Sequence, residues 1–370
     1  MKKIFLALAA VAALAACSKS EVAYEYDREI TFSAVTKNIT KSMMETALFD
    51  TDEQFNVWAF YNPTTTPNSN IEAWVAEYNA NTENGAKVYV DEKPFASHSD
   101  YAEWAGVTPY FWPKVGTLAF AGYYPTTMKN NVAYELTSSK NCMTLTDIQR
   151  SWVTAEDNHR EDLMYFNLTQ CYSGKDAAPV VTAVFKHALS WLTVNLSTTE
   201  ETLGLGATIT VSSVKFTEVY PSGDAVVDNQ AAIAWAPDGT AGNVEVVAEP
   251  VVLDDEVAMQ KEPLFIPQDM NGNLEITYTV SSPVDSEGHI SSFTETKVIE
   301  LATLKGWVPK VDGDGNVVTD NEGNPVLELG NLSKWEDAKH YIYNVVITTS
   351  EILIDAEVVT WDEIEIPVEY

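Results

Sequence analysis

The chain of 370 residues is poor in cations, with 22 lysines and arginines against 54 aspartates and glutamates, which gives a formal net charge of −32. So acidic a chain repels nucleic acid and anionic lipid surfaces, which excludes nucleic acid as a partner. The charge is compatible with a basic partner surface, but solubility in an exposed setting is the favoured explanation.

Cysteine is also scarce, and the three cysteines have no metal-site spacing. Cys142 and Cys171 stand apart from the N-terminal Cys17, and a disulfide between them in an oxidising compartment stays open but is not favoured. Histidine is equally sparse, with five residues and no His-Glu-x-x-His arrangement. We therefore expect no metal and no cofactor.

Catalytic motifs are missing as well. The sequence has no Gly-x-Ser-x-Gly elbow and no glycine-rich phosphate loop, and His187 is expected to be structural. Acidic pairs are too abundant for any chosen pair to indicate a glycosidase. Residues 312–316 resemble the start of a calcium loop but lack its later glycine and glutamate, so a hairpin turn is favoured. The sequence predicts a protein that is not an enzyme.

The one long apolar run lies at the N-terminus. Lys2 and Lys3 precede it, and residues 14–17 are Leu-Ala-Ala-Cys, a bacterial lipobox. This predicts a lipoprotein signal peptide over residues 1–16, with Cys17 acylated and becoming the new N-terminus. Because serine rather than aspartate follows Cys17, the outer membrane or cell surface is the expected location, reached only through the lipid anchor. No later stretch is apolar enough to span a bilayer.

Short alternating or β-branched segments separated by turn residues fill most of the remaining sequence. They predict many strands and few helices, with residues 71–78 as the best short helix. This pattern of short strands and turns is typical of β-sandwich domains. A boundary near residues 174–179 would divide the chain into two such domains. The expected strands lie at residues 29–35, 55–61, 118–124, 180–185, 189–196, 207–219, 274–280, 292–301, 341–347 and 352–358.

The last residues alternate regularly between apolar and polar side chains. Such a segment forms a strand with one apolar and one charged face, and Pro367 suits an edge or terminal strand because it cannot donate to a ladder. A strand of this kind requires a groove to bury its apolar face. The residues of that face are Ile364, Ile366, Val368 and Tyr370.

Four strings in this order resemble the fimbrillin-like family, the pilins of type V pili in Bacteroidia. The first runs from Thr-Pro-Tyr-Phe-Trp-Pro-Lys at residues 108–114 to Tyr-Tyr-Pro at 123–125. The second is Asp-Leu-Met-Tyr at 162–165, and the third is Phe-Lys-His-Ala-Leu at 185–189. The fourth runs from residue 341 to residue 361. Each string is weak alone, but their order behind a lipobox makes the resemblance fairly specific.

The resemblance implies an all-β chain with two transthyretin-like β-sandwich domains in tandem. It implies a lipidated propeptide over residues 17–41 that contains a removable first strand at residues 29–35. An N-terminal domain over residues 42–176 and a C-terminal domain over residues 177–370, with the terminal donor strand, would follow. A trypsin-like maturation protease would cut between Lys41 and Ser42; relatives often carry arginine at the cut, whereas this chain offers Lys37 and Lys41.

The expected function is that of a structural pilin in a cell-surface fimbrium, which supports adhesion. Loss of the first strand would open an apolar groove, and the C-terminal segment of a neighbouring pilin, of the same or a related kind, would fill it. The alternative is a monomeric surface lipoprotein or a tip adhesin that binds glycan or a host or bacterial surface protein. An acidic-residue hydrolase has only composition in its favour.

Overall fold

The computed structural model describes fifteen stretches of the chain, and every structural statement below refers to them. They are residues 28–33, 54–64, 70–97, 103–137, 141–154, 162–168, 171–173, 180–228, 231–247, 249–253, 261–283, 286–310, 312–313, 318–320 and 326–360. No helix within these stretches is long and apolar enough to cross a membrane.

The protein is all-β, as the pattern of short alternating segments predicted. Strands in the first half of the chain are β1 (Thr31–Ser33), β2 (Gln54–Asn62), β3 (Lys87–Ser97), β4 (Glu103–Gly106), β5 (Thr117–Tyr124), β6 (Val132–Leu136), β7 (Asn141–Gln149), β8 (Ser151–Thr154), β9 (Met164–Phe166), β10 (Cys171–Tyr172) and β11 (Lys186–His187).

The second half of the chain is equally rich in strands. They are β12 (Ser190–Ser197), β13 (Thr208–Val219), β14 (Ser222–Val227), β15 (Ile233–Asp238), β16 (Gly242–Val247), β17 (Val251–Leu253), β18 (Lys261–Phe265), β19 (Gln268–Asp269), β20 (Asn273–Ser281), β21 (Ser292–Glu300), β22 (Lys305–Pro309), β23 (Leu327–Asn331), β24 (Lys334–Trp335), β25 (Lys339–Ile347) and β26 (Ile352–Thr360).

Helices are short, as expected. The predicted helix at residues 71–78 is α1 (Ile71–Ala80), and its N-cap Asn70 accepts a hydrogen bond from the backbone N–H of Ala73 at 3.1 Å. The other helical segments are α2 (Glu200–Gly204) and the 3₁₀ turns η1 (Thr82–Asn84), η2 (Thr126–Asn130) and η3 (Leu301–Thr303).

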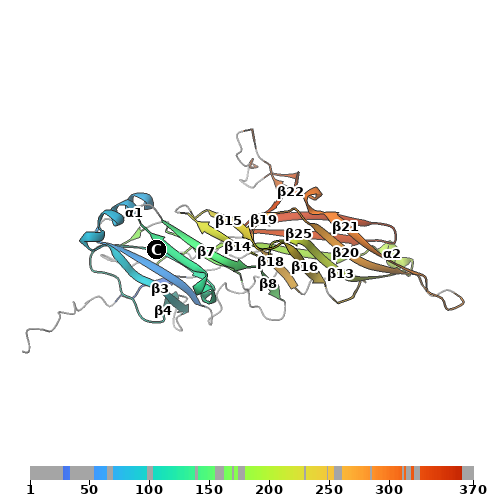
Figure 1. Ribbon diagram of the computed structural model, residues 1–370, viewed down its shortest axis with the longest axis horizontal. Helices are drawn as coiled ribbons and strands as arrows, with labels where there is room; N and C mark the ends of the chain where they lie inside the picture. The colour runs from blue at the N-terminus through green and yellow to red at the C-terminus, as the bar shows by residue number, and fades with distance from the viewer. Residues whose placement is uncertain are drawn as a thin grey trace, which may run out of the picture.

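Two sets of sheets lie end to end in an elongated molecule (Figure 1). One half contains an eight-stranded sheet in the order β1-β4-β3-β2-β5-β9-β11, with β10 also paired to β5. The other half packs a seven-stranded sheet, β23-β22-β26-β25-β12-β18-β8, against a sheet in the order β16-β13-β20-β21, with β17 also on β13. A four-stranded sheet, β15-β14-β7-β6, joins the two halves, and β19 pairs with β24.

Strands cross between the halves in both directions. The hairpin β14–β15, from the second half of the sequence, pairs with β7 from the first. Conversely, β8 pairs with β18 in the seven-stranded sheet. The domain boundary between residues 176 and 177 stays a prediction, but any division there separates strands that are hydrogen-bonded to each other.

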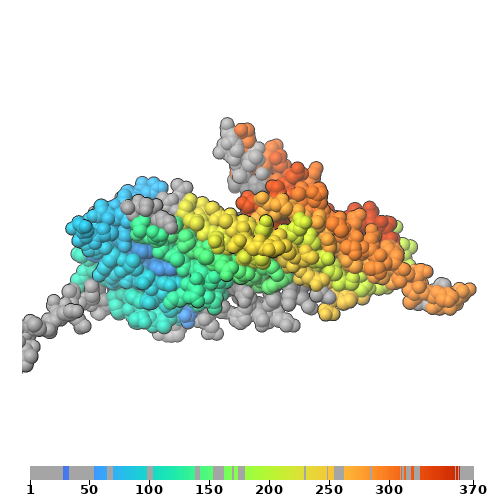
Figure 2. All heavy atoms as spheres, in the orientation of Figure 1, coloured from blue at the N-terminus to red at the C-terminus, as the bar shows by residue number. Residues whose placement is uncertain are grey.

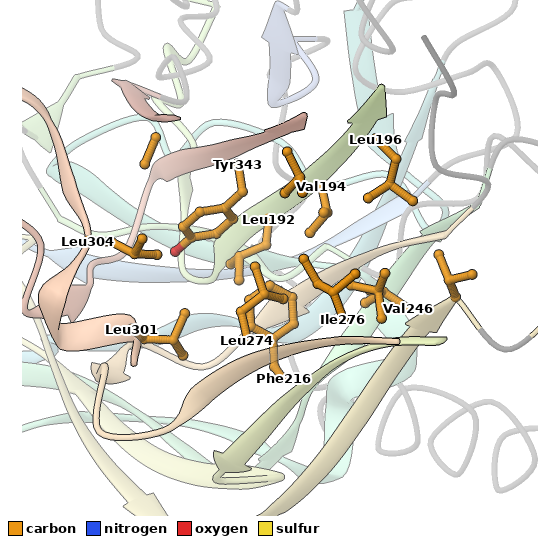
Figure 3. Close-up of a cluster of buried hydrophobic side chains, with 14 of the residues drawn as sticks. Leu192, Val194, Leu196, Phe216, Val246, Leu274, Ile276, Leu301, Leu304 and Tyr343 are labelled. Carbon is orange, nitrogen blue, oxygen red and sulfur yellow. The ribbon is translucent and has the colours of Figure 1, made fainter. Parts of the chain in front are cut away.

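Three clusters of buried apolar side chains form the cores. The largest lies between the two sheets of the second half, where Phe216, Leu274 and Ile276 face Leu192 and Tyr343 (Figure 3). The strict alternation of buried and partly buried residues along β20 and β25 places one face of each strand in this core. Burial of these side chains against each other stabilises the sandwich.

Most predicted strands are confirmed within a residue or two, including those at residues 55–61, 118–124, 189–196, 341–347 and 352–358. The segment at 180–185 differs, because it forms only isolated bridges before the short strand β11. Its backbone is irregular where it approaches β1 (Thr31–Ser33).

Candidate functional site: the first strand and its groove

The first strand occupies the interior of the N-terminal half. Residues 28–33 alternate in character, so Ile30 and Phe32 point to one side of the strand and Thr31 to the other. Ile30 and Phe32 are fully buried, whereas Thr31 is partly exposed. The strand is therefore an integral part of the core and is shown in blue in the left half of Figure 2.

Backbone hydrogen bonds hold this strand on both sides. On one side the N–H of Ile30 donates to Tyr110 at 2.7 Å and the N–H of Trp112 donates to Arg28 at 3.0 Å. On the other side the N–H of Val181 donates to the carbonyl of Thr31 at 2.8 Å. The antiparallel register with β4 places Phe32 opposite Trp104. The strand thus lies between two other segments and is not a free edge.

Phe32 is enclosed by other phenylalanine rings. The ring centroids of Phe55, Phe95 and Phe120 lie 5.5, 5.1 and 5.5 Å from its own, and all three are edge-to-face with it. Phe166 adds a tilted contact at 6.1 Å. Edge-to-face pairs at this spacing are the favoured aromatic geometry. The position of Phe32 is therefore shaped for an aromatic side chain.

Beneath the strand lies an apolar groove contributed by several distant segments. Sequence analysis predicted three of these segments as strands, at residues 55–61, 118–124 and 180–185, but not their convergence, because the contacts join residues far apart in the chain. We define the acceptor groove as the buried side chains around Ile30 and Phe32, namely Phe55, Phe95, Trp104, Trp112, Phe120, Phe166, Val181 and Phe185.

A small cavity adjoins the groove. Three neighbours of β1, Phe120, Phe166 and Val181, form part of its lining. Asn167, Tyr172, Thr182 and Val184 complete the wall. The groove therefore has an aromatic floor and a small cavity beside it.

Two of the strings that carried the family resemblance meet next to this groove. His187 of β11 is opposite Met164 of β9 in the sheet register. The Nδ1 atom of His187 lies 2.5 Å from Oδ2 of Asp162, and both side chains are fully buried. The pair connects the segment that follows Val181 to the body of the sheet, which agrees with the structural role expected for His187.

A second buried polar cluster lies on β12, β18 and β25. The carboxylate of Glu262 accepts hydrogen bonds from Trp191 Nε1 at 2.7 Å and from the hydroxyl of Thr193 at 2.6 Å. His340 stacks on Trp191 with ring centroids 3.7 Å apart, and its Nε2 lies 2.8 Å from Thr193 Oγ1.

Burial changes the proton affinity of both ionisable members. Loss of hydration lowers the pKa of His340 to about 3, and burial raises the pKa of Glu262 above its usual range. His340 is therefore neutral at pH 7. Its contacts with Trp191 and Thr193 fix the orientation of the His340 ring, which agrees with a role in stabilising the sheet.

The predicted functional residues lie largely outside the described stretches. These are the lipidation site Cys17, the processing pair Lys41 and Ser42, and the donor residues Ile364, Ile366, Val368 and Tyr370. Of the predicted first strand, residues 29–33 are described and residues 34–35 are not. The structure therefore places the strand and its groove, and leaves the other assignments as predictions.

Two smaller expectations concern cysteine and metal. Cys142 on β7 and Cys171 on β10 are both buried and are not joined by a disulfide. Across the described stretches, no three histidine, cysteine or acidic side chains are grouped so as to hold a metal ion. The loop at residues 312–316 is only partly described.

The fold matches that of a solved fimbrial protein, and two further solved structures are less similar. A fimbrial protein from Bacteroides vulgatus is 15% identical, with 91% of this chain and 100% of that chain covered and a TM-score of 0.54. A putative cell adhesion protein from Bacteroides uniformis is 11% identical over 90% and 99%, with a TM-score of 0.44. A fimbrilin from Porphyromonas gingivalis is 11% identical over 91% and 98%, with a TM-score of 0.33.

No curated protein sequence matches the chain. The profile of the fimbrillin-like family, in contrast, matches residues 36–361, which is most of the sequence and nearly all of the described structure. That span includes both strand-rich halves and the four strings that carried the resemblance. The chain belongs to the fimbrillin-like family.

Proposed function

We propose that this protein is a pilin subunit of a cell-surface fimbrium that polymerises by strand exchange. The observation that supports the proposal best is the first strand, because Ile30 and Phe32 are fully buried although they precede the predicted cut at Lys41. Removing residues up to Lys41 would take this strand away and leave the acceptor groove open. An open groove exposes apolar surface and unpaired backbone groups, which drives strand addition.

The subunit would reach the surface as a lipoprotein. Acylation of Cys17 would hold it at the outer membrane, and the first strand would keep the groove filled during export. A trypsin-like protease would then cut after Lys41 and release both the anchor and the strand. Occupation of the groove by the chain's own strand thus prevents polymerisation before the protein is outside.

The residue pattern of the C-terminal segment matches that of the first strand it would replace. Ile30 and Phe32 present an aliphatic and then an aromatic side chain two residues apart, and Val368 and Tyr370 do the same in the same direction. Phe32's position favours an aromatic ring because four phenylalanines surround it. We therefore place Tyr370 of the donor where Phe32 was and Val368 where Ile30 was.

Burial of these two side chains contributes about 1.5–3 kcal/mol each, and the ladder hydrogen bonds add to it. Ile364 and Ile366 precede them on the same face of the donor and would bury further apolar surface. Such a joint between copies would dissociate slowly, as a fimbrium requires.

Controlled proteolysis tests this function. Trypsin-like digestion of the purified chain should remove the segment through Lys41, as shown by intact mass, and should produce multimers that survive an unboiled denaturing gel. Lys41→Gln should leave monomers, whereas Lys37→Gln should assemble normally. A chain that lacks residues 361–370 should be cut and stay unassembled.

Other outcomes would reject the assignment. Multimers in the truncated chain would contradict the donor segment, and multimers in Lys41→Gln would contradict the cut. A cut wild-type chain that stays monomeric would favour the alternative, a surface lipoprotein or tip adhesin that binds glycan or host protein.

A further inference from the structure

The hairpin formed by β22 and β23 carries an apolar surface that faces solvent. Trp307 is directly opposite Leu329, and Leu327 lies two residues from Leu329 on the same face. The other face of the hairpin is covered, since Val308 packs against the main core. We name as the donor patch the three exposed side chains: Trp307, Leu327 and Leu329, which are 46%, 49% and 54% exposed.

The donor patch stands beside the point where the C-terminal segment leaves the fold. β22 runs parallel to β26, with Trp307 opposite Glu357, so the hairpin points the same way as the chain leaving Thr360. Thr360 is three residues beyond Glu357, or roughly 10 Å along the strand. The hairpin projects from the body of the molecule there (Figures 1 and 2).

The acceptor also has exposed apolar side chains, on the segment that borders β1. Residues 107–115 include Tyr110 and Trp112, whose backbones bond to Ile30 and Arg28. We name as the acceptor rim the exposed members of this segment: Val107, Phe111 and Val115, which are 60%, 39% and 59% exposed. The rim flanks the Arg28 end of the groove.

Chain length brings the two surfaces together in a polymer. If Val368 and Tyr370 take the positions of Ile30 and Phe32, residue 366 lies where Arg28 was, and only residues 361–365 connect it to Thr360. The six residue steps from Thr360 to residue 366 span at most about 22 Å. The Arg28 end of the neighbouring copy's groove must therefore lie close to Thr360. This is the end that carries the acceptor rim. The projecting hairpin of the first copy lies next to Thr360 and so faces that rim.

We propose that the donor patch of one copy packs against the acceptor rim of the next, as a second contact of the joint that is separate from the donor strand. This inference rests on the proposed function, since the donor strand is what sets the two copies side by side. Its occupant is a second copy of this chain. Apolar packing at this place fixes the angle between successive subunits and shields the base of the donor strand from water.

The experiment separates this contact from the groove itself. The double variants Trp307→Ser with Leu329→Ser, and Val107→Ser with Val115→Ser, each remove one side of the contact. Leu205→Ser and Phe293→Ser are matched controls, because both side chains are similarly exposed, and they lie at the end of α2 and on β21, which pair with neither β22 nor β23. Each protein is cut with the trypsin-like protease, and two quantities are measured: the rate of self-assembly and the affinity for a synthetic peptide of residues 361–370.

The peptide needs only the groove, so both double variants should bind it within about twofold of wild type. Self-assembly of both should slow at least tenfold, while the controls assemble normally. Trp307→Lys and Val115→Glu should each slow assembly alone, and their combination should restore it, because the opposite charges then meet across the joint.

Normal assembly of both double variants, with peptide binding intact, would overturn the second contact and leave strand exchange standing. Failure of the charge pair to restore assembly would overturn the pairing of these two surfaces. A cut wild-type chain that neither binds the peptide nor assembles would overturn both the contact and the proposed function.

Discussion

Phe32 is the residue on which attachment of the first strand depends most. It is fully buried and touches four phenylalanine rings, although the strand that carries it is short and has polar residues on its other face. If the chain is cut after Lys41 as proposed, the contribution of Phe32 is confined to the unprocessed chain, and this side chain would distinguish the precursor from the polymer.

Phe32→Ala should destabilise the uncut protein by about 3–5 kcal/mol, because it leaves a cavity among rings that cannot collapse into it. Fibres assembled from cut Phe32→Ala should be as stable as wild type, since the altered residue has left. Phe55→Ala is the control and should weaken both forms. Denaturant midpoints of the precursor and of the multimers measure these stabilities. An equal loss of stability in both forms of Phe32→Ala would show that the first strand is retained in the multimers.

His340 should give the protein a measurable acid sensitivity. Its pKa is lowered to about 3 by burial, against 6.5 in the unfolded chain. Between these values only the unfolded chain takes up the proton, so this residue's contribution to stability is present above pH 6.5 and is lost as the pH falls towards 3. The slope is at most about 1.4 kcal/mol per pH unit.

His340→Phe keeps a ring that can stack on Trp191 and should flatten this pH dependence. Glu262 acts in the opposite sense, because its raised pKa lets the folded state bind a proton first as the pH falls. The comparison is therefore best made in a Glu262→Gln background. Urea midpoints at pH 7, 6, 5 and 4 test it, and parallel curves with and without His340 would contradict the assignment.

At the scale of elements, β5 is the central strand of the N-terminal half, and every one of its residues is buried. It pairs with β2 on one side and with β9 and β10 on the other. Gly122 allows β5 to pack closely against β2 and the Phe166 ring. A Cβ at this position would lie 2.4 Å from the Phe166 ring and 2.5 Å from the Asn56 carbonyl oxygen. The absence of a side chain at this position allows strand and ring to approach each other.

Gly122→Ala should therefore cost about 1–3 kcal/mol, because the carbonyl belongs to the paired backbone and cannot move aside. Gly242→Ala is a matched control, since a Cβ there meets nothing within 4 Å. Thermal or denaturant unfolding distinguishes them. Because Phe166 is part of the acceptor groove, Gly122→Ala should also weaken binding of the 361–370 peptide, and unchanged stability would show that the ring yields easily.

At the scale of the whole molecule, the crossing strands make the two halves interdependent. The β14–β15 hairpin is bonded to β7, and β8 is bonded to β18, so neither half can unfold without breaking ladders in the other. If the subunits polymerise as proposed, the fibre would transmit load through hydrogen-bonded sheets between its joints.

The uncut protein should accordingly unfold in one cooperative transition despite its length. Calorimetry and the fluorescence of its tryptophans should give the same midpoint. Two well-separated transitions would indicate that the halves behave as independent domains and that the crossing strands melt early.

The sequence by itself determined the class of the protein. Alternation, turn residues and the scarcity of helical periods predicted an all-β chain, and the positions of β2, β5, β25 and β26 followed because strand patterns are local. The first strand was also predicted, since Ile30 and Phe32 alternate with polar residues. The family resemblance rested on short strings, two of which pair across β9 and β11 in the fold.

Only the tertiary structure decided what surrounds the first strand. The phenylalanines that enclose Phe32 come from β2, β3, β5 and β9, and no local pattern indicates that they converge. The bridge from Val181, the strands exchanged between the halves and the exposed faces of the donor patch and acceptor rim are likewise long-range outcomes. They follow from packing, which selects partners by shape and burial across the whole chain, whereas sequence periodicity reports only which face of each strand is apolar.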